Sequence, residues 1–396
     1  SHLYHTYMAH NRYKTNGELN YILSGAHPQV IGGKIEERGD HVFITNCEMA
    51  AVHNGQIDID RGRYGLDDKC CDTLGLLHFY RENGEDEIIK RIPGSYTFAI
   101  ADAKKEGVIV ARDSHGIKPG FLGIKDGKYY VASESTAFRD NGGELVDDLI
   151  PGSVYYLTPD GSYQKKMVVE PKPQECFFEW NYIAHPHSVL NNLPVRTVRK
   201  ALGIRLAQEF RPKDIDLVTF VPRCPEIAAQ AYADATGVKF LPLFYKIRGE
   251  RSFQGPTKEE RLESINKNLY LIRGLDNLSG KNVLVVDDSL IRGNVVKRVW
   301  ALLKNAGVKK GYFASYTPPI GIIGDDNAAR GCMFGVDMPP NDNFIARGKT
   351  LEQISQEVGM EVYYLSKKGM FEVYGNLAKN PKDLCSFCIG GKHPFS

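Results

Sequence analysis

The sequence predicts two successive domains, an α+β half followed by an α/β half that is built on a parallel sheet. Up to about residue 165, short strand patterns alternate with turn signals and one helical pattern, which is typical of packed sheets with few helices. From about residue 195, strand and helix patterns alternate, as they do in βαβ units. Pro171, Pro173 and Pro186 mark the junction between the two patterns. At 396 residues, the chain is long enough for each half to have its own core.

In the first half, runs of apolar and β-branched residues are bounded by turn-forming residues. One helical pattern, Asp72–Glu82, interrupts these runs. The predicted strands are His41–Cys47, Tyr96–Asp102, Gly107–Arg112, Lys128–Ser133 and Ser153–Thr158.

In the second half, the hydrophobic period changes repeatedly between that of a helix and that of a strand. The predicted order is helix Val195–Glu209, strand Leu217–Val221, helix Ile227–Thr236 and strand Lys239–Leu243. Because a helix separates each strand from the next, the strands are expected to run parallel in one sheet.

The segment Asn282–Asn294 carries the clearest functional signal. Val283–Val286 predicts a buried strand, which ends in Asp287 and Asp288 and is followed by a short loop and a helix, Asn294–Asn305. Unpaired N–H groups and the positive end of a helix dipole attract anions at such a junction. The two acids would repel a bare phosphate, but they suit sugar hydroxyls or Mg²⁺. The segment therefore predicts a site for a ribose that carries a 5′-phosphate and a diphosphate, although a parallel strand with a polar turn also occurs in many other α/β proteins.

The overall composition argues against several classes of protein. A formal net charge of +2 gives no general attraction to nucleic acid or to a membrane surface. No apolar run approaches the roughly 18 residues that span a bilayer, and the chain does not open with a signal-peptide pattern. We therefore expect a cytoplasmic protein, in which the eight cysteines do not form a disulfide framework.

Short phrases along nearly the whole chain occur together in one order. They are HNRYKTNG (10–17), AAVHNGQI (50–57), CDTLGLLH (71–78), PGSYTFAIAD (93–102), ARDSHGIKPGFLG (111–123), VASESTAF (131–138), PGSVYYL (151–157) and NVLVVDDSLIRGN (282–294). The last resembles the binding motif of type I phosphoribosyltransferases. Together the phrases resemble the glutamine phosphoribosylpyrophosphate amidotransferases (amidophosphoribosyltransferases), which join an N-terminal-nucleophile glutaminase to a phosphoribosyltransferase.

The resemblance implies a glutaminase-type sandwich, incomplete at its start, followed by a type I phosphoribosyltransferase domain with a parallel sheet. The implied domains are 1–165 (glutaminase-like, without its opening segment), 166–375 (phosphoribosyltransferase) and 376–396 (a cysteine-bearing tail).

By resemblance, the catalytic groups of the first half stabilise the oxyanion that forms during amide hydrolysis. The donors would be the side-chain amide of Asn54 and the backbone N–H of Gly55, in a His-Asn-Gly turn. A free amino acid also needs an arginine for its carboxylate and an acid for its ammonium group. The glutamine-binding residues that the resemblance implies are Arg12, Thr15, His53 and Asp72.

The catalytic cysteine of the family has no counterpart in this sequence. In the family it stands at the mature N-terminus, several tens of residues before the Arg12 motif, and its own amino group acts as the base. Neither Ser1 nor Cys47, the first cysteine, is in register to replace it. We expect that the nucleophile segment lies upstream of this sequence or comes from a partner polypeptide, or that this paralogue has lost glutaminase activity. The chain alone is expected not to hydrolyse glutamine.

In the second half, the resemblance implies that the acid pair holds the ribose hydroxyls or Mg²⁺ and that the following loop wraps the 5′-phosphate. A mobile loop, Tyr245–Lys267, would close over the substrate and exclude water. The implied phosphoribosyl pyrophosphate-binding residues are Asp287, Asp288, Ser289, Arg292, Gly293, Asn294, Lys246, Arg251 and Arg223, with Asp287 and Asp288 also the magnesium ligands.

Two positions depart from the family pattern. The loop 222–226 contains no glycine, and Pro225 has no N–H to donate to a diphosphate. The guanidinium of Arg223 would replace the lost amides, or the site no longer accepts pyrophosphate. After Asn294, which we expect to cap the helix, Val295 contributes no hydroxyl.

The C-terminal motif Cys385-Ser-Phe-Cys388 is by itself compatible with a redox pair, half of a zinc site or hydrophobic packing. Some members of the family hold a [4Fe–4S] cluster with four cysteines, and the matching positions here are Cys176, Cys332, Cys385 and Cys388. Zinc is the main alternative. The remaining cysteines, Cys47, Cys70, Cys71 and Cys224, are expected to be structural.

The resemblance implies an enzyme of purine nucleotide synthesis. It would transfer ammonia from glutamine to phosphoribosyl pyrophosphate and form 5-phosphoribosylamine, as a homo-oligomer with nucleotides as feedback ligands. One alternative is a transferase on the same frame that uses free ammonia, another nucleophile or another sugar phosphate. The other is a catalytically silent regulatory subunit, for which the chain shows no basic stripe that would bind nucleic acid.

Overall fold

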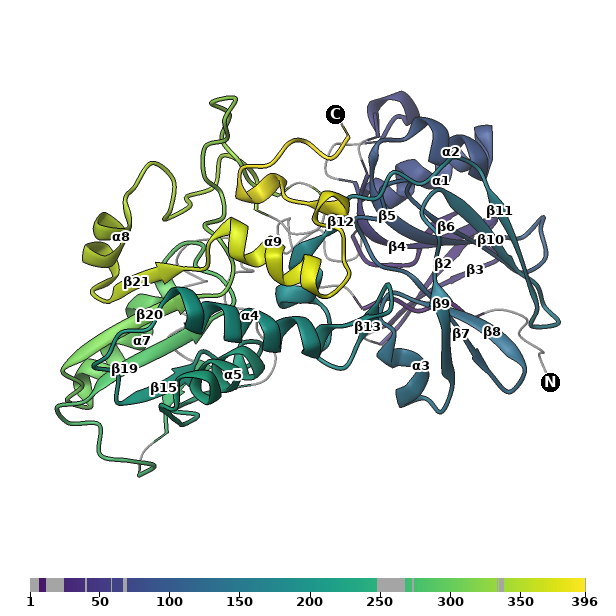
Figure 1. Ribbon diagram of the computed structural model, residues 1–396. Coiled ribbons are helices and arrows are strands. Elements are labelled where there is room, and N and C mark those ends of the chain that lie inside the picture. Colours follow the sequence, from purple (N-terminus) through teal and green to yellow (C-terminus); the bar gives the residue numbers. More distant parts are fainter. Residues whose placement is uncertain are drawn as a thin grey trace. The chain divides into compact units, whose positions relative to one another are not determined.

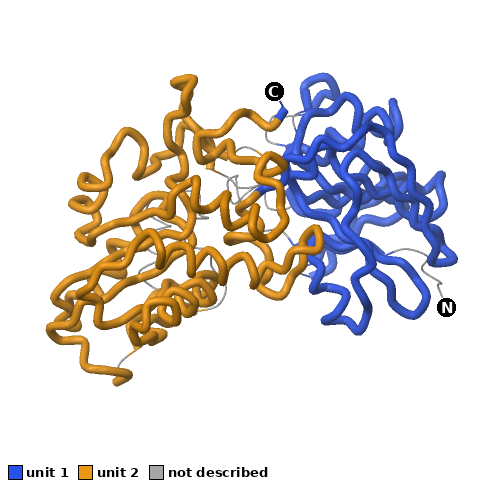
Figure 2. The backbone as a smooth tube through the Cα atoms, viewed as in Figure 1, with its two compact units in different colours: residues 1–176, 395 blue, residues 177–394, 396 orange. Residues whose placement is uncertain are grey.

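The computed structural model describes residues 7–11, 25–39, 41–57, 59–66, 70–247, 268–272, 274–332, 334 and 338–395. The chain forms two compact units, residues 1–176 with 395 and residues 177–394 with 396 (Figure 2). Unit 1 has the predicted α+β character, and unit 2 has the predicted α/β character. Unit 1 extends past residue 165, since it includes β11 (Tyr163–Met167) and ends with β12 (Glu175–Cys176).

Unit 1 contains a six-stranded sheet, a three-stranded sheet and a two-stranded hairpin (Figure 1). The six-stranded sheet has the order β1 (Gln29–Ile31), β4 (Met49–Ile57), β5 (Gly94–Asp102), β6 (Val108–Arg112), β10 (Ser153–Leu157) and β11. The three-stranded sheet has the order β8 (Lys128–Ala132), β7 (Phe121–Lys125) and β9 (Glu144–Asp148), and the hairpin pairs β2 (Lys34–Arg38) with β3 (His41–Thr45). The helices are α1 (Asp72–Asn83), α2 (Glu85–Arg91) and α3 (Thr136–Asp140), with a 3₁₀ turn at Gly62–Tyr64.

The two faces of the six-stranded sheet have different partners. Leu76 and Leu77 of α1 pack with Ala51 and Phe98 on one face, in the larger core of this unit. On the other face, residues of β6 and β10 pack with Leu122 of β7 in a smaller core. Alternate side chains of each strand therefore point to the helices or to the second sheet.

Unit 2 is built on a five-stranded parallel sheet. Its order is β16 (Lys239–Phe240), β15 (Leu217–Phe220), β19 (Asn282–Asp287), β20 (Lys310–Ser315) and β21 (Glu361–Tyr364). The strand order reverses between β15 and β19, and ligands of open parallel sheets bind at such a switch point, beyond the carboxyl ends of the strands. The fold therefore brings the loop after β15 and the loop after β19 to one edge.

Helices cover both faces of this sheet. The helices are α4 (Val195–Glu209), α5 (Glu226–Thr236), α7 (Asn294–Asn305), α8 (Leu351–Val358) and α9 (Lys367–Asn376). Apolar side chains of α7 and α8 share one core with β19, whose residues Val283–Val286 are completely buried. α4 and α5 approach closely at Gly203, where a Cβ would lie 2.1 Å from the carbonyl oxygen of Ala228. Short elements complete the unit: a π-helix at Glu179–Ile183, β13 (Val189–Leu190), β14 (Leu193–Pro194), β17 (Phe244–Lys246), β18 (Leu269–Leu271), β22 (Leu384–Cys385) and 3₁₀ turns at Pro381–Asp383 and Phe387–Ile389.

The structure confirms the predicted fold class and most of the predicted elements. The helices Val195–Glu209 and Asn294–Asn305 have the predicted bounds. One local prediction is wrong, because the His-Asn-Gly sequence does not form a turn but lies inside β4, paired along its length with β5. Long-range pairing has overridden the turn preference of Asn-Gly. None of the helices in the described ranges has the length and apolar character needed to cross a bilayer.

Candidate functional site

The candidate phosphoribosyl site lies at the carboxyl end of β19. Asp287 and Asp288 are 8% and 7% exposed. The backbone N–H of Asp288 donates to Oδ1 of Asp287 at 2.9 Å, and Oγ of Ser289 donates to Oδ2 of Asp288 at 2.7 Å. The strand and these bonds hold both carboxyl groups at the sheet edge.

Burial makes the ionised form of these acids costly. It raises the pKa of Asp288 to about 6, although the hydroxyl of Ser289 and the charge of the buried Arg199 oppose this shift. Burial, and next the charge of Asp288, raise the pKa of Asp287, while the charge of Lys246 lowers it. Lys246 and the acid pair, which the sequence predicted for one site, are therefore near enough to interact. A bound cation or sugar hydroxyls would stabilise both carboxylates.

The loop after the acids leads into α7. Gly293 is the N-cap of α7 with a φ of +81°, and a Cβ there would lie 2.6 Å from Cδ1 of Ile345. Asn294 is the first residue of the helix, so the prediction that Asn294 caps it is wrong. Among the residues that the structure describes, no side chain caps this end, which leaves the N–H groups of the first turn for an anion.

Arg292 has a partner that the sequence did not suggest. Its Nε donates to Oδ1 of Asp342 at 3.2 Å, and its Nη2 also bonds with this carboxylate. The two side chains are 13% and 16% exposed. The pair ties the loop after β19 to a segment fifty residues further along the chain, and Asp342 neutralises much of the charge that Arg292 would offer to a phosphate.

The loop after β15 lies across the switch point from the acid pair. The peptide bond between Pro222 and Arg223 is cis, Arg223 is exposed, and α5 starts after Pro225. The thiol of Cys224 points inward and bonds with the carbonyl oxygens of Asn181 and Tyr182 at 3.4 and 3.5 Å. Burial raises the pKa of Cys224 to about 12, so this thiol stays protonated near neutral pH.

A buried hydrogen-bond network supports this loop, and the sequence did not reveal it. Tyr316 donates its hydroxyl to the carbonyl of Asn181 at 2.8 Å, and Tyr374 donates to the side-chain oxygen of Asn181 at 2.7 Å. Arg199, which is 1% exposed, donates to three carbonyl oxygens of Trp180, Tyr182 and Ala184. The sequence feature that could have suggested this network is Arg199 itself, which stands among the buried apolar positions of α4.

The candidate glutamine site of unit 1 is formed where β4 meets the start of α1. Gly55 has a φ of +142°, and a Cβ there would lie 1.8 Å from the carbonyl oxygen of Ser95 on β5. Only glycine fits this close approach of two backbones. Asn54 precedes Gly55 on β4 and is half-buried.

His53 and Asp72, both predicted for this site, lie together. Nδ1 of His53 is 3.9 Å from Oδ1 of Asp72, and it is 3.2 Å from Oγ1 of Thr73. The carboxylate of Asp72 also accepts the N–H groups of Ile57 and Thr73, each at 2.9 Å. Burial lowers the pKa of His53, which opposes the effect of Asp72 and keeps the imidazole neutral near pH 7. Because strand side chains alternate, His53 projects from one face of β4 and Asn54 from the other.

Several predicted residues cannot be placed. Arg12 and Thr15 of the glutamine site, and Arg251 of the phosphoribosyl site, lie outside the described residues.

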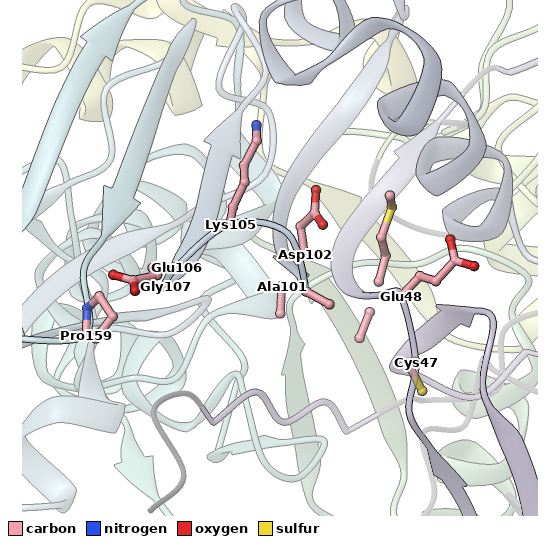
Figure 3. A pocket seen from close by; sticks show the side chains of 11 residues that line it. Cys47, Glu48, Ala101, Asp102, Lys105, Glu106, Gly107 and Pro159 are labelled. Carbon is pink, nitrogen blue, oxygen red and sulfur yellow. The ribbon is translucent and has the colours of Figure 1, made fainter.

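A pocket of about 440 Å³ opens at the other end of β4, beside Ala50 (Figure 3). Asp102 in its wall accepts the hydroxyl of Tyr80 at 3.0 Å, and Lys105 pairs with Glu85 at 3.1 Å. None of the predicted site residues that the structure describes lines this pocket, so it gives no support to either predicted site.

Three of the four cysteines predicted for the iron–sulfur cluster belong to unit 2. Burial raises the pKa of Cys385 to about 12, and the nearby Cys332 adds to this shift. Cys388 lies in the next 3₁₀ turn, and Cys176 is the last residue of unit 1. Within the described ranges, no three His, Cys, Asp or Glu side chains are grouped so that they could hold a metal ion. The iron–sulfur and magnesium sites therefore stay predictions.

Comparisons with known proteins agree with this architecture. The glutamine amidotransferase domain family matches residues 34–140. The amidophosphoribosyltransferase of Bacillus subtilis (strain 168) is 29% identical over 397 residues, which are 96% of this chain and 79% of the relative. That of Archaeoglobus fulgidus is 29% identical over 408 residues, 98% of this chain and 83% of the relative.

Solved structures show the same likeness in three dimensions. The glutamine phosphoribosylpyrophosphate amidotransferase of B. subtilis complexed with ADP and GMP matches with a TM-score of 0.78 and 26% identity, covering 97% of this chain and 82% of the other. A structure described as the allosteric regulatory enzyme of purine biosynthesis matches with the same TM-score of 0.78 and 27% identity, covering 97% and 81%. The family indicated by the sequence phrases is thus confirmed, and the chain is a relative of the amidophosphoribosyltransferases, with their glutaminase and phosphoribosyltransferase domains.

Proposed function

We propose that this chain takes part in the glutamine-dependent transfer of ammonia to phosphoribosyl pyrophosphate, which yields 5-phosphoribosylamine, the first step of purine nucleotide synthesis. The observation that supports this most is the acid pair, Asp287 and Asp288, at the switch point of the parallel sheet and directly before the uncapped start of α7. The names of the relatives support the same reaction.

The arrangement suits each part of the proposed substrate. Ribose hydroxyls would donate to the carboxylates of Asp287 and Asp288, and the 5′-phosphate would accept the N–H groups of the first turn of α7. The charge of Lys246 would lie toward the diphosphate. Arg223 is the basic group of the loop that contains two prolines, and we assign it the diphosphate contacts that backbone amides cannot make there.

We also propose the cofactors and regulators that the family suggests. Mg²⁺ would bind at Asp287 and Asp288 together with the diphosphate, whose charge it would partly neutralise.

A [4Fe–4S] cluster would be held by Cys176, Cys332, Cys385 and Cys388 in a structural role. Purified protein is expected to be brown and to contain iron and sulfide; a colourless protein that contains zinc would contradict the cluster. Nucleotides are the expected feedback ligands of a homo-oligomer, by analogy with the relative bound to ADP and GMP.

Two nitrogen donors test the two halves separately. With ammonium chloride as donor, the protein is expected to release pyrophosphate from phosphoribosyl pyrophosphate, because this reaction needs only the site in unit 2. Asp288→Asn should reduce the rate at least about 100-fold, whereas the exposed control Asp325→Asn should leave it unchanged. A rate that Asp288→Asn leaves intact would contradict the proposal. The same pyrophosphate assay with glutamine as the nitrogen donor then tests whether unit 1 supplies ammonia.

The loop 222–226 favours a second candidate function. Pro222 and Pro225 provide no N–H groups, and the amide of Glu226 is directed to the carbonyl of Arg223 at 3.4 Å. A divergent enzyme that binds a phosphoribosyl group with a different leaving group, or a silent regulatory subunit, would need fewer diphosphate contacts. Binding of ribose 5-phosphate as tight as that of phosphoribosyl pyrophosphate would favour this candidate.

A further inference from the structure

One cysteine side chain anchors the loop 222–226 to the buried part of unit 2. The sulfur of Cys224 lies 3.4 and 3.5 Å from the carbonyl oxygens of Asn181 and Tyr182, and 3.6 Å from the hydroxyl oxygen of Tyr316. Tyr316 directly follows β20 and is completely buried. Groups from two other segments of the chain therefore surround the thiol and fix the direction of this side chain.

Asn181 connects this anchor to the other loops at the same edge of the sheet. Its carbonyl oxygen accepts the hydroxyl of Tyr316 at 2.8 Å, and its Nδ2 donates to Oγ1 of Thr317 at 2.9 Å. Oγ of Ser315 lies 2.7 Å from the carbonyl oxygen of Thr317 and 3.2 Å from that of Asp288. The three hydroxyl-bearing residues at the end of β20 are completely buried, so water does not compete for these bonds. The network thus links the loop after β15 to the end of β20 and to the acid pair.

The anchored thiol lies close to the acid pair. Burial raises the pKa of Cys224 most, the charge of Arg199 opposes this shift, and the charges of Asp288 and Asp287 add to it. Such charges act on a buried group only over short distances. Because Arg223 is the neighbour of Cys224 in the chain, the anchor also places the backbone of Arg223 near the acid pair.

The exposed basic residue of this loop is Arg223. The thiol of the next residue points inward, whereas Arg223 is exposed, and Pro222 and Pro225 have no N–H groups to offer to an anion. A guanidinium can bind a phosphate group through two parallel hydrogen bonds, but this geometry requires that the guanidinium is held in a fixed position. What the loop offers to a diphosphate therefore depends on how firmly the thiol is anchored.

We propose that Tyr316, held in place by Asn181, is a positioning residue for the diphosphate end of the phosphoribosyl site. It acts through the thiol of Cys224, which fixes the loop that presents Arg223 to the ligand. This inference rests on the proposed function of unit 2 and explains how a loop without glycine binds a diphosphate. The ribose and its 5′-phosphate contact the loop after β19 instead, so their binding does not depend on the anchor.

The test is calorimetry of the full chain with phosphoribosyl pyrophosphate and with ribose 5-phosphate, in the presence of magnesium chloride. Tyr316→Phe removes the hydroxyl that bonds with Asn181 but keeps the buried ring. We expect the affinity for phosphoribosyl pyrophosphate to fall about tenfold, and that for ribose 5-phosphate to change less than about threefold. Equal losses for the two ligands would overturn the proposal, because they would assign Tyr316 to the unit as a whole.

Tyr312→Phe is the matched control. Tyr312 lies on β20, is 2% exposed, and its hydroxyl donates to the carboxylate of Asp214 at 2.5 Å. The change removes the same group from the same strand, but Asp214 precedes β15 and therefore lies away from the carboxyl ends of the strands. Tyr312→Phe should alter neither affinity, and a selective loss of phosphoribosyl pyrophosphate binding in this variant would also overturn the proposal.

A double-mutant cycle tests whether Tyr316 acts through Arg223. Arg223→Ala should lower the affinity for phosphoribosyl pyrophosphate about 30-fold. Adding Tyr316→Phe should then have no further effect, because the group that it positions is already absent. Additive losses would refute this route. If the wild type binds neither ligand, the proposed function fails together with this inference. If it binds phosphoribosyl pyrophosphate and Tyr316→Phe binds it as tightly, this inference alone fails.

Discussion

The two candidate sites are assembled in different ways. In unit 2, Asp287, Asp288 and Gly293 lie within a few residues of one another, and the parallel topology itself places their loop at the ligand-binding edge. In unit 1, His53 and Asp72 come from separate segments, β4 and α1, and meet only because α1 packs on the sheet. A site in a βαβ unit can therefore be recognised from a short sequence motif, whereas a site in an antiparallel sandwich depends on contacts between distant segments.

The largest expected effect tests this dependence in unit 1. Gly55→Ala places a Cβ 1.8 Å from the carbonyl oxygen of Ser95, so β4 and β5 must separate, and we expect a loss of about 3 kcal/mol or more in the free energy of unfolding. Gly127→Ala is the matched control. Gly127 also has a positive φ, of +72°, but a Cβ there meets nothing within 4 Å, so the cost should be only about 1 kcal/mol. Equal costs in urea unfolding would show that the approach of the strands is not the constraint.

The next effect tests whether the site of unit 2 is purely local. Asp342→Ala leaves the guanidinium of Arg292, which is 13% exposed, without this partner, and it should cost about 2 kcal/mol. If the pair is the reason, the double variant Arg292→Ala/Asp342→Ala should recover part of the loss. Glu36→Ala breaks an exposed pair with Arg38 and should cost less than about 0.5 kcal/mol. Additive losses in the double-mutant cycle would contradict the coupling of the two segments.

A third prediction separates ligand binding from stability. Asp288→Asn removes a buried charge but keeps the shape of the side chain, so the midpoint of thermal unfolding should stay the same or rise. The affinity for phosphoribosyl pyrophosphate should fall at least about tenfold, because carboxylates accept sugar hydroxyls more strongly than amides do. Calorimetry and thermal unfolding of one preparation measure both quantities. A lower midpoint together with unchanged affinity would assign Asp288 to the fold and not to the site.

The smallest expected effect is the pH dependence of unit 1. Burial lowers the pKa of His53 in the folded protein, so below about pH 6.5 the unfolded chain binds more protons than the folded one. The contribution of His53 to stability is therefore present above that pH and is lost as the pH falls through its folded pKa. Urea unfolding at pH 7.5 and pH 5.5 should show a smaller difference for His53→Gln than for the wild type. An identical difference would mean that His53 does not titrate in this range.

Local patterns in the sequence predicted much of the fold. The bounds of α4 and α7 followed from helical periodicity, and the buried run Val283–Val286 identified the central strand of unit 2. The same reasoning misread His53-Asn54-Gly55 as a turn, because the preference of Asn-Gly for turns is weaker than nine residues of pairing with β5.

The partners of buried polar groups were the part that local patterns did not reveal. Nothing near Arg292 in the sequence points to Asp342, and nothing near Arg199 points to the carbonyl oxygens of the π-helix. A charged side chain on an apolar helix face signals a buried partner, but it does not identify it. Such partners are set by three-dimensional packing, because a desolvated donor must find an acceptor wherever the fold provides one.

The sequence by itself determined the order of strands and helices, the acid pair before a helix N-terminus and the family to which these motifs point. It could do so because helix and strand periods, turn residues and a βα loop are properties of neighbouring residues. Only the tertiary structure showed that Gly55 lies in a strand and that His53 of this strand lies beside Asp72 of α1. Residues of a strand and a helix that are distant in the sequence come together only when the sheet and the helix have packed, and the pKa of an imidazole depends on that burial and on its neighbours.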